Sequence, residues 1–491
     1  MNMPQKPRLL TKTAYGYGLL CDKLFWMYQN KRDELPEPDE ATQAIFDQGH
    51  LIGNLAKSIY PDGVEIDWSS GHDAGIAQTS TALRDRIPIF EAGFQHGQTH
   101  ARADILRPAA RGAWDLIEVK SSGQVKDEHY EDVAFQKHVY EGAGVRIGRC
   151  FVMHVDKTYV RKGEVEAARL LKLADVTQEI KPLKIKVPAE VKRMLSVMAR
   201  EKCPDAPIGR HCADCCLYED CWSFLPERSI FSLHRAGAMA YDLKEQGILK
   251  TADIPDDFPL TKGQSIQKSC EKSGKPHIEP KVIRAFLEQL RYPLHFLDFE
   301  TFMTAVPQYD LMSPYEQVPF QYSLHVAGSQ RERGVYYSFL SDGSIDPRPE
   351  ILTGLKKRLG TAGSIVAYNA QFEVRVLESC VRHFPKFGAW LESIRPRVVD
   401  LHAPFRDFHY YHPGQSGSTS LKAVMPALTG RDYEELEIAD GQTASLRFRE
   451  MAFGNLAEAG KKAIRKALEI YCRQDAEGMS GIIKALRRLC D

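Results

Sequence analysis

Apolar and polar positions along this chain follow a helical period in some stretches and a strand period in others. Residues 9–29 carry apolar side chains at helical spacing, and residues 129–142 do the same, so both are predicted to be helices. Residues 99–106 and 113–119 read as strands, and the turn-rich segment 107–112 joins them. The first part of the chain therefore combines helices with at least one strand pair.

The rest of the chain repeats this mixture, and its texture changes between Leu225 and Pro293. Residues 165–200 are helical or mixed, and residues 229–254 resemble two short helices around a Gly turn. A polar stretch around Lys262-Gly263 and Ser273–Lys275 is typical of a linker. Strands are predicted at 295–298, 318–327, 334–341 and 364–368, and helices at 349–359, 371–383 and 461–488. The pattern indicates an α/β protein with three parts, 1–225, 226–291 and 292–491.

The composition is that of an ordinary globular protein and does not indicate a particular binding partner. The 491 residues are 43% hydrophobic and 26% charged, which allows several buried cores and about two to four domains. Lysine plus arginine equals aspartate plus glutamate at 65 each, so no overall positive field points to nucleic acid. The basic runs at 181–193 and 461–466 are typical of solvated helix faces.

Membrane insertion and export are not expected from the sequence. No apolar run approaches the roughly 18 residues that a membrane helix needs, and the first residues lack a secretory pattern. We therefore expect a cytoplasmic protein.

Cysteines are concentrated in one place. Four of the eleven lie between Cys212 and Cys221, and without an export signal such a cluster indicates a metal site and not disulfides. Cys212, Cys215 and Cys221 form C-x2-C-x5-C, and Cys21 far upstream can complete a cage of four thiolates, which select zinc or an iron–sulfur cluster. Spare candidates are Cys203 and Cys216, and Cys216 could replace Cys215.

The strand pair carries the first set of candidate acids. Glu118 and Lys120 are two residues apart on one strand, so they share a face, and Asp104 on the partner strand can reach the same edge. Two carboxylates can bind Mg²⁺ or Mn²⁺, and a lysine beside them can position the attacking water and stabilise charge on a phosphate.

Four further residues support this interpretation or qualify it. Gln136 and Tyr140 share one face of the predicted helix, and His50 lies upstream as a possible ligand. Glu91 is either another ligand or a charge at the edge of a strand.

Taken in order, these residues resemble those of the iron–sulfur RecB-like nucleases of the PD-(D/E)XK superfamily, which include the CRISPR adaptation nuclease and AddB-type nucleases. The resemblance covers residues 9–224. It implies a restriction-endonuclease-like fold and a [4Fe–4S] cluster that ties the ends of the domain together. The residues to which it assigns roles are the cluster ligands Cys21, Cys212, Cys215 and Cys221, the metal ligands His50, Asp104 and Glu118, and the assisting residues Lys120, Gln136 and Tyr140.

A second acidic pattern begins the last part of the chain. Asp298 and Glu300 share one face of an otherwise apolar strand, where two carboxylates repel each other and lose hydration unless a cation neutralises them. Tyr471 and Asp475 are four residues apart on a predicted helix and share a face. Glu373 lies at the start of another predicted helix.

This second pattern resembles the DnaQ-like DEDD exonucleases, which have an RNase H-like fold. Asp298 and Glu300 match the D-x-E motif, and Tyr471 and Asp475 match Y-x3-D. The resemblance covers roughly 292–488 and implies two metal ions held by Asp298, Glu300, Glu373 and Asp475, with Tyr471 orienting the water. The family has aspartate where this chain has Glu373, and Asp400 could compensate.

The sequence therefore predicts a metal-dependent nuclease with a [4Fe–4S] cluster and Mg²⁺ or Mn²⁺. Its expected substrate is DNA, single-stranded or with free ends, in repair, recombination or CRISPR-type antiviral defence, alongside other proteins of those processes. Two alternatives remain open. One is a nucleic-acid-binding scaffold with one or both sites inert, and the other is a zinc-stabilised RNA exonuclease.

Overall fold

A computed structural model describes residues 8–433 and 435–490. The chain divides into two compact units. The first takes in the chain up to Ser223 together with Thr304–Glu316, and the second takes in Phe224–Met303 and the chain from Gln317 onward. Each unit combines a sheet with helices, so the protein is mixed α/β, as the sequence predicts. Within the described residues, no helix has the length and apolar character that crossing a bilayer requires.

The first unit is built on one sheet with the strand order β2-β3-β4-β5-β6-β7, and β1 pairs in parallel with β4. Strands β3, β4 and β5 form an antiparallel meander, and helix α5 then leads to β6, which runs parallel to β5. The strands are β1 (Leu10–Thr11), β2 (Val64–Glu65), β3 (Ile89–His96), β4 (Thr99–Pro108), β5 (Trp114–Lys120), β6 (Ile147–Val155) and β7 (Leu171–Asp175). The helices are α1 (Lys12–Leu20), α2 (Asp22–Asn30), α3 (Glu40–Ser58), α4 (His72–Ala82), α5 (Asp127–Gly142), α6 (Ala167–Leu170), α7 (Lys181–Met198) and α8 (Tyr218–Trp222).

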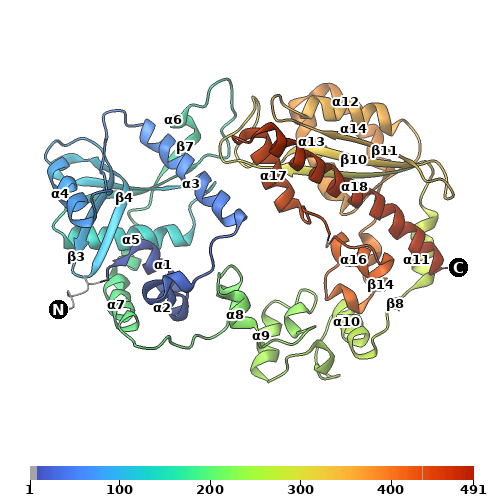
Figure 1. Ribbon diagram of the computed structural model, residues 1–491, viewed down its shortest axis with the longest axis horizontal. Coiled ribbons are helices and arrows are strands. Elements are labelled where there is room, and N and C mark those ends of the chain that lie inside the picture. Colours follow the sequence, from blue (N-terminus) through green and yellow to red (C-terminus); the bar gives the residue numbers. More distant parts are fainter. Residues whose placement is uncertain (1–7, 434, 491) are drawn as a thin grey trace. The chain divides into compact units, whose positions relative to one another are not determined.

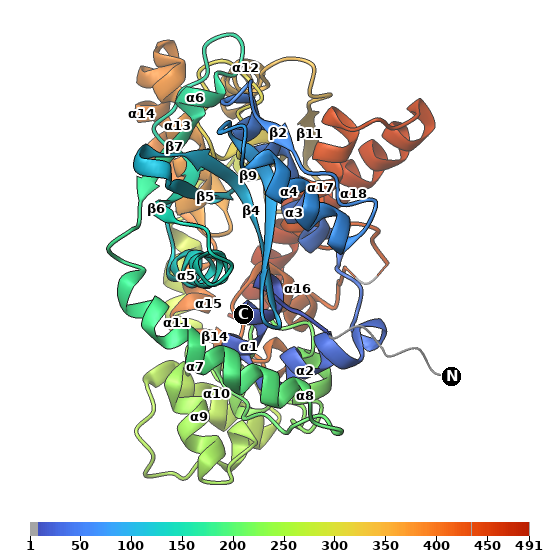
Figure 2. The same cartoon turned by 90° about the vertical axis from the view of Figure 1, so that its left-hand side faces the viewer.

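Helices cover both faces of this sheet. On one face, α1, α5 and α7 bury a core that includes Leu116 of β5, and Figure 2 shows α5 end-on beside β4. On the other face, α3 and Ala305 pack against the side chain of Ile117. Because adjacent strand residues point to opposite faces, Glu118 and Lys120 face the side of α1 and α5.

The second unit is built on a sheet with the order β11-β10-β9-β12-β13. Strand β9 pairs antiparallel with β10 and parallel with β12, and β8 and β14 form a separate ribbon. The strands are β8 (His277–Ile278), β9 (Leu294–Phe302), β10 (Val318–Ala327), β11 (Val335–Leu340), β12 (Ser364–Ala367), β13 (Val398–Asp400) and β14 (Tyr410–Tyr411). The helices are α9 (Ala238–Glu245), α10 (Lys262–Ser273), α11 (Pro280–Glu288), α12 (Arg348–Leu359), α13 (Ala370–His383), α14 (Gly388–Ile394), α15 (Ala403–Arg406), α16 (Leu421–Thr429), α17 (Gly441–Phe453) and α18 (Glu458–Arg488).

Strand β9 is central in this sheet and is covered on both sides. Its odd-numbered residues Leu297 and Phe299 pack into a core with α12, α13 and α14. Its opposite face meets α17 and the long helix α18, which runs along the sheet in Figure 1. Asp298 and Glu300 therefore point to the α17 and α18 side.

The predicted helix 9–29 is wrong in its details. Residues 10–11 form β1, and the helical part is broken into α1 and α2 at Cys21, whose backbone is extended (φ −161°, ψ 127°). The break turns the Cys21 side chain out of the run of helical positions. Apolar spacing alone cannot show such a break, because Cys21 itself fits the helical pattern.

The predicted linker is also wrong. The polar stretch forms helix α10, which begins after Thr261. Gln264 N–H donates to the Thr261 hydroxyl, and Thr261 N–H donates to the Gln264 side chain, 3.4 and 2.9 Å apart. This reciprocal pair is a capping box. In the segment 229–254, α9 is the one α-helix. Three-residue 3₁₀ turns lie before it at Ile230–Ser232 and after it at Thr251–Asp253.

Most other predicted elements are confirmed within a few residues. They are β4, β5, α5, β9, β10, β11, β12, α12, α13 and α18. The sequence interpretation left out β3 and β6 and the helices α3, α4, α16 and α17, and it described the segment that contains β7 and α7 only as helical or mixed.

Candidate functional site

The second unit gathers the four acids that the sequence places in one set. Strand β9 supplies Asp298 and Glu300, α13 supplies Glu373 in its first turn, and α18 supplies Asp475. Glu300, Glu373 and Asp475 are 6%, 4% and 5% exposed. Carboxylates are rarely this buried unless something neutralises them.

The four carboxyl groups act on one another electrostatically. Burial, and then the charge of Asp475, raises the pKa of Asp298 well above its usual value. Burial, followed by the charges of Asp298 and Asp475, does the same to the pKa of Glu300. Burial raises the pKa of Asp475 to about 6. Burial and mutual repulsion disfavour the charged forms of these carboxyl groups, and a divalent cation among them would favour those forms.

Glu373 lies in the same cluster with one oxygen unused. Its pKa is raised well above the usual value by burial and by the charge of Asp298. Its Oε2 is buried and has no hydrogen-bond partner in the part of the chain that the structure describes. A buried acceptor without a partner is costly, so this oxygen is suited to a ligand.

Asp400 does not stand in for Glu373. Its Oδ1 accepts the N–H groups of Asn369 (3.1 Å) and Ala370 (3.3 Å) at the start of α13, and Oδ2 is 2.8 Å from Arg406 Nη1. Asp400 therefore holds the turn that presents Glu373.

Sequence motifs missed two residues that join this cluster. Tyr433 donates a hydrogen bond from its hydroxyl to Asp475 Oδ1. Lys422 Nζ lies 5.2 Å from the ring centre of Tyr471 and 5.7 Å from that of Tyr433. Its positive charge acts to lower the pKa values of Asp298, Glu300 and Asp475. Neither residue belongs to a spaced motif, so no sequence signal marked them.

In the first unit, Asp104 and Glu118 are neighbours across the β4–β5 ladder. Ile105 pairs with Ile117, which places the two acids next to each other in the register. Asp104 Oδ2 accepts the Val119 N–H at 2.6 Å. Burial, and then the charge of Glu118, raises the pKa of Asp104 to about 7.

Two lysines surround Glu118, and the sequence interpretation named only one of them. Glu118 is 1% exposed, and its Oε1 lies 2.9 Å from Lys120 Nζ and 2.5 Å from Lys12 Nζ. Burial alone would raise the pKa of Glu118, but these two ammonium groups hold it below its usual range. Lys120 also pairs with Asp132 at 2.6 Å. Lys12 begins α1, far from the E-x-K motif in sequence, so spacing could not reveal it.

Helix α5 places Gln136 and Tyr140 differently. Gln136 donates from its side-chain amide to Glu118 Oε2. The Tyr140 hydroxyl donates to the Ala92 carbonyl and accepts the Ala103 N–H at 2.7 Å. Tyr140 is fully buried, so it ties β3 to β4 beside Asp104, and Gln136 orients Glu118.

Of the other two candidate ligands, Glu91 lies beside Asp104, and His50 does not contact the acids of this site. Glu91 is in the left-handed backbone region (φ 55°), lies opposite Asp104 in the continuous β3–β4 register, and its negative charge acts on Asp104. Strained backbone is common beside functional groups. His50 is exposed on α3, which packs on the sheet face opposite Glu118. Among the described residues, no hydrogen bond or ion pair joins His50 to Asp104 or Glu118.

Binding of Mn²⁺ to the first unit is expected to weaken below about pH 7. The pKa of Asp104 is raised to about 7, so below that pH the ion must displace a proton from the carboxyl group. The apparent affinity should then fall by up to about tenfold per pH unit. Titration of Mn²⁺ followed by electron paramagnetic resonance, with the Glu300→Ala variant used to weaken the second site, measures this. Asp104→Asn should remove the dependence, and equal wild-type affinities at about pH 6 and about pH 8 would contradict it.

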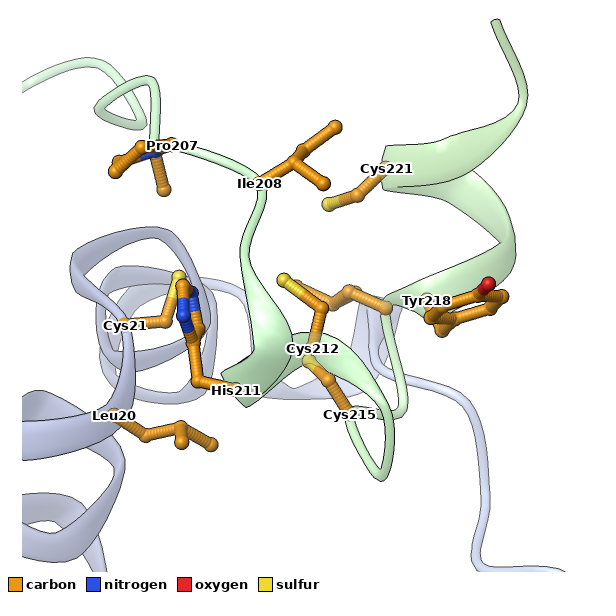
Figure 3. A pocket seen from close by; sticks show the side chains of 11 residues that line it. Leu20, Cys21, Pro207, Ile208, His211, Cys212, Cys215, Tyr218 and Cys221 are labelled. Atoms are coloured by element: carbon orange, nitrogen blue, oxygen red, sulfur yellow. The ribbon is translucent and has the colours of Figure 1, made fainter. Parts of the chain in front are cut away.

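The four cysteines assigned to the cage line one pocket. Cys21, Cys212, Cys215 and Cys221 all border it, whereas Cys216 is exposed and outside it. In Figure 3, the side chains of Cys21, Cys212 and Cys221 point toward a shared space, and Cys215 lies on the turn that follows Cys212. The geometry favours Cys215 over Cys216.

The chemistry of this pocket is suited to a thiolate-bound metal group. The four cysteines that line the pocket form no disulfide with one another. Burial, and then the nearby thiols, raises the pKa of Cys215 to about 11, so without a metal the Cys215 thiol is protonated. Lys23 Nζ lies 3.3 Å from Cys221 Sγ and can stabilise negative charge on it. A cluster of soft thiolates at one place matches zinc or iron–sulfur chemistry.

Comparisons with known proteins add little about function. Residues 295–420 match a family described as a domain of unknown function, DUF2779, and this stretch includes Asp298, Glu300 and Glu373. No curated protein matches the chain. The crystal structure of SSO0001 is similar at a TM-score of 0.26 and 10% identity, over 46% of this chain and 90% of that one. A likeness at this TM-score supports no argument about fold or activity.

Proposed function

We propose that this protein is a metal-dependent nuclease with two separate acidic sites and an iron–sulfur cluster. The observation that carries the proposal is the gathering of four carboxyl groups in the second unit, three of them in buried residues and that of Asp298 in a half-buried one, with Glu373 Oε2 left without a partner among the described residues. Without a cation, this arrangement costs desolvation and repulsion. With Mg²⁺ or Mn²⁺, it matches the resemblance to the DEDD exonucleases.

Strand order supports the two fold assignments that go with the proposal. The order β11-β10-β9-β12-β13, with only the β9–β10 and β10–β11 pairs antiparallel, is the arrangement expected of an RNase H-like sheet. The β3–β4–β5 meander, followed by α5 and the parallel strand β6, is the arrangement expected of a PD-(D/E)XK core.

In the second unit, the residues have separate tasks. Asp298, Glu300, Glu373 and Asp475 would hold the ions, which supply Lewis acidity and an activated water for phosphodiester hydrolysis. Tyr471 would orient the attacking water. Tyr433 orients the Asp475 carboxyl group, to which its hydroxyl donates a hydrogen bond. Lys422 places a positive charge beside both rings, where it can stabilise a phosphate.

In the first unit, Asp104 and Glu118 would hold the ion. Lys120 orients the water and stabilises phosphate charge, and Gln136 fixes the Glu118 carboxylate. His50 remains a predicted ligand, although it is exposed on α3. Cys21, Cys212, Cys215 and Cys221 would hold a [4Fe–4S] cluster, for which we assign a structural role.

Hydrolysis of end-labelled single-stranded DNA tests the proposal. The wild-type protein with Mg²⁺ or Mn²⁺ should release nucleotides from a 3′-labelled strand, and Glu300→Ala should abolish this. Asp104→Ala should abolish a separate cleavage that is seen with the 5′ label. If both variants kept full activity, the two assignments would fail. A parallel RNA substrate decides between DNA and RNA.

One feature favours the scaffold alternative for the second unit. Glu373 replaces the family's aspartate with a side chain one methylene longer, and a shift of that size can inactivate a metal site. Tight binding of DNA without metal-dependent cleavage would support the scaffold.

Lys12→Met is expected to increase the affinity of the first unit for Mn²⁺ by at least about tenfold, because the ammonium of Lys12 competes with a cation at Glu118. Cleavage by this unit should nevertheless fall about 10- to 100-fold, as is typical when a residue supporting a metal ligand is lost. Electron paramagnetic resonance and the labelled-strand assay measure the two effects. Lys137→Met, which removes a lysine paired with Glu141 (3.1 Å), is the control and should change neither.

A further inference from the structure

One thiol lies among the carboxyl groups of the second unit. Cys472, next to Tyr471 on α18, is fully buried. One ligand atom from each of Cys472, Asp298 and Glu300 lies within 4.8 Å of the other two. Cys472 Sγ is 3.7 Å from Asp298 Oδ2.

That separation matches two ligands of one ion. Metal–sulfur and metal–oxygen bonds of about 2.3 and about 2.0 Å at a tetrahedral angle put the two ligand atoms about 3.5 Å apart. A weak S–H hydrogen bond to the carboxylate has a similar length, so distance alone does not decide. The unpartnered Oε2 of Glu373, buried in the same cluster, is an independent sign of a missing ligand.

The backbone around Cys472 is held in place. Its carbonyl accepts a hydrogen bond from the Ser323 hydroxyl at 2.6 Å, and Ser323 pairs with Asp298 across the β9–β10 ladder. The thiol is therefore fixed beside Asp298 by the sheet that also fixes the carboxylate. A residue placed this way is a preorganised ligand.

We propose that Cys472 is a soft ligand of the second-unit metal site, which therefore binds Zn²⁺ in preference to Mg²⁺. The inference rests on the proposed metal site of this unit and goes beyond it by assigning the ion. On binding, the S–H bond breaks, its proton leaves to solvent, and a metal–sulfur bond forms. Mg²⁺ prefers oxygen ligands and would leave the thiol protonated.

Titration of the intact, cluster-loaded protein with Cd²⁺ tests the inference, since Cd²⁺ bound to thiolate absorbs in the ultraviolet. The wild type should show this absorption with one more equivalent of Cd²⁺ than Cys472→Ser does. The ratio of Cd²⁺ to Mg²⁺ affinity should fall at least tenfold in Cys472→Ser. Cys270→Ser, which removes a buried thiol packed against Phe408 and Tyr411, is the matched control and should behave as wild type.

A second variant keeps the inference testable if Cys472→Ser does not fold. Asp298→Asn keeps the thiol but removes its neighbour, and the same absorption should weaken. Identical Cd²⁺ spectra and affinity ratios in wild type and Cys472→Ser would overturn the inference. If Mg²⁺-dependent trimming at the 3′ end persisted in both, the proposed nuclease function would stand. If Asp298→Asn changed neither metal binding nor trimming, the metal site itself would be wrong.

Discussion

Asp298→Asn is expected to abolish trimming at the 3′ end while making the metal-free protein more stable. The loss should be about a thousandfold or more, because an ion supplies several kcal/mol of transition-state stabilisation and about 1.4 kcal/mol is worth a factor of ten. The gain in stability arises because the Asp298 carboxyl group is desolvated and its negative charge repels those of Asp475 and Glu300. An amide of the same shape removes one repelling charge.

The gain in stability should depend on pH in a defined direction. The pKa of Asp298 is raised on folding, so the folded state binds more protons than the unfolded state between about pH 4 and the raised pKa. The charge therefore destabilises the wild type at neutral pH, and the penalty disappears toward pH 4. The variant should melt higher than wild type at neutral pH, by about 2–4 °C for each kcal/mol, with little difference near pH 4.

Calorimetry with and without Mn²⁺ provides the measurement. Mn²⁺ should raise the melting temperature of the wild type much more than that of Asp298→Asn. Asp342→Asn, which changes an exposed aspartate of the same unit, is the control and should show neither effect. A destabilised Asp298→Asn variant at neutral pH, in the absence of metal, would contradict the account of the acidic cluster.

Periodicity explains why the sequence could locate the acids. Asp298 and Glu300 alternate with Leu297 and Phe299 along β9, and the strand period puts the two pairs on opposite faces. Asp104 and Glu118 meet because the meander fixes their register. In both places the decisive contacts lie within one strand or between adjacent strands, which local patterns describe well.

Tertiary packing explains what the sequence could not locate. Lys12 reaches Glu118 only because β1 pairs with β4 and starts α1 at the sheet edge. Lys422 and Tyr433 come to Asp475 from separate segments with no shared spacing. Helix α10 is different, because its Thr261 and Gln264 form a visible capping box. The sequence interpretation gave more weight to the polar composition of that stretch than to the capping box, and therefore predicted a linker.

Cys21→Ser is expected to remove most of the iron and sulfide and to lower the melting temperature of the first unit by at least about 10 °C. Structural metal sites contribute on the order of 10 kcal/mol to folding, and a unit of this size shifts by about 2–4 °C for each kcal/mol. Cys21 ends α1, whose first residue, Lys12, contacts Glu118. Loss of the cluster should therefore also stop cleavage that depends on Asp104, while trimming that depends on Glu300 continues.

Two cysteine controls and one metal analysis make this result decisive. Cys216→Ser should keep its iron, because Cys216 is exposed and does not line the pocket. Cys203 is near enough to Cys21 and Cys221 for their charges to act on it, so retention of iron in Cys21→Ser but not in Cys203→Ser would make Cys203 the fourth ligand. Anaerobically purified protein with stoichiometric zinc and no sulfide would replace the cluster by a zinc site. That result would favour the zinc-stabilised RNA exonuclease, because it removes the link between the pocket and the RecB-like nucleases.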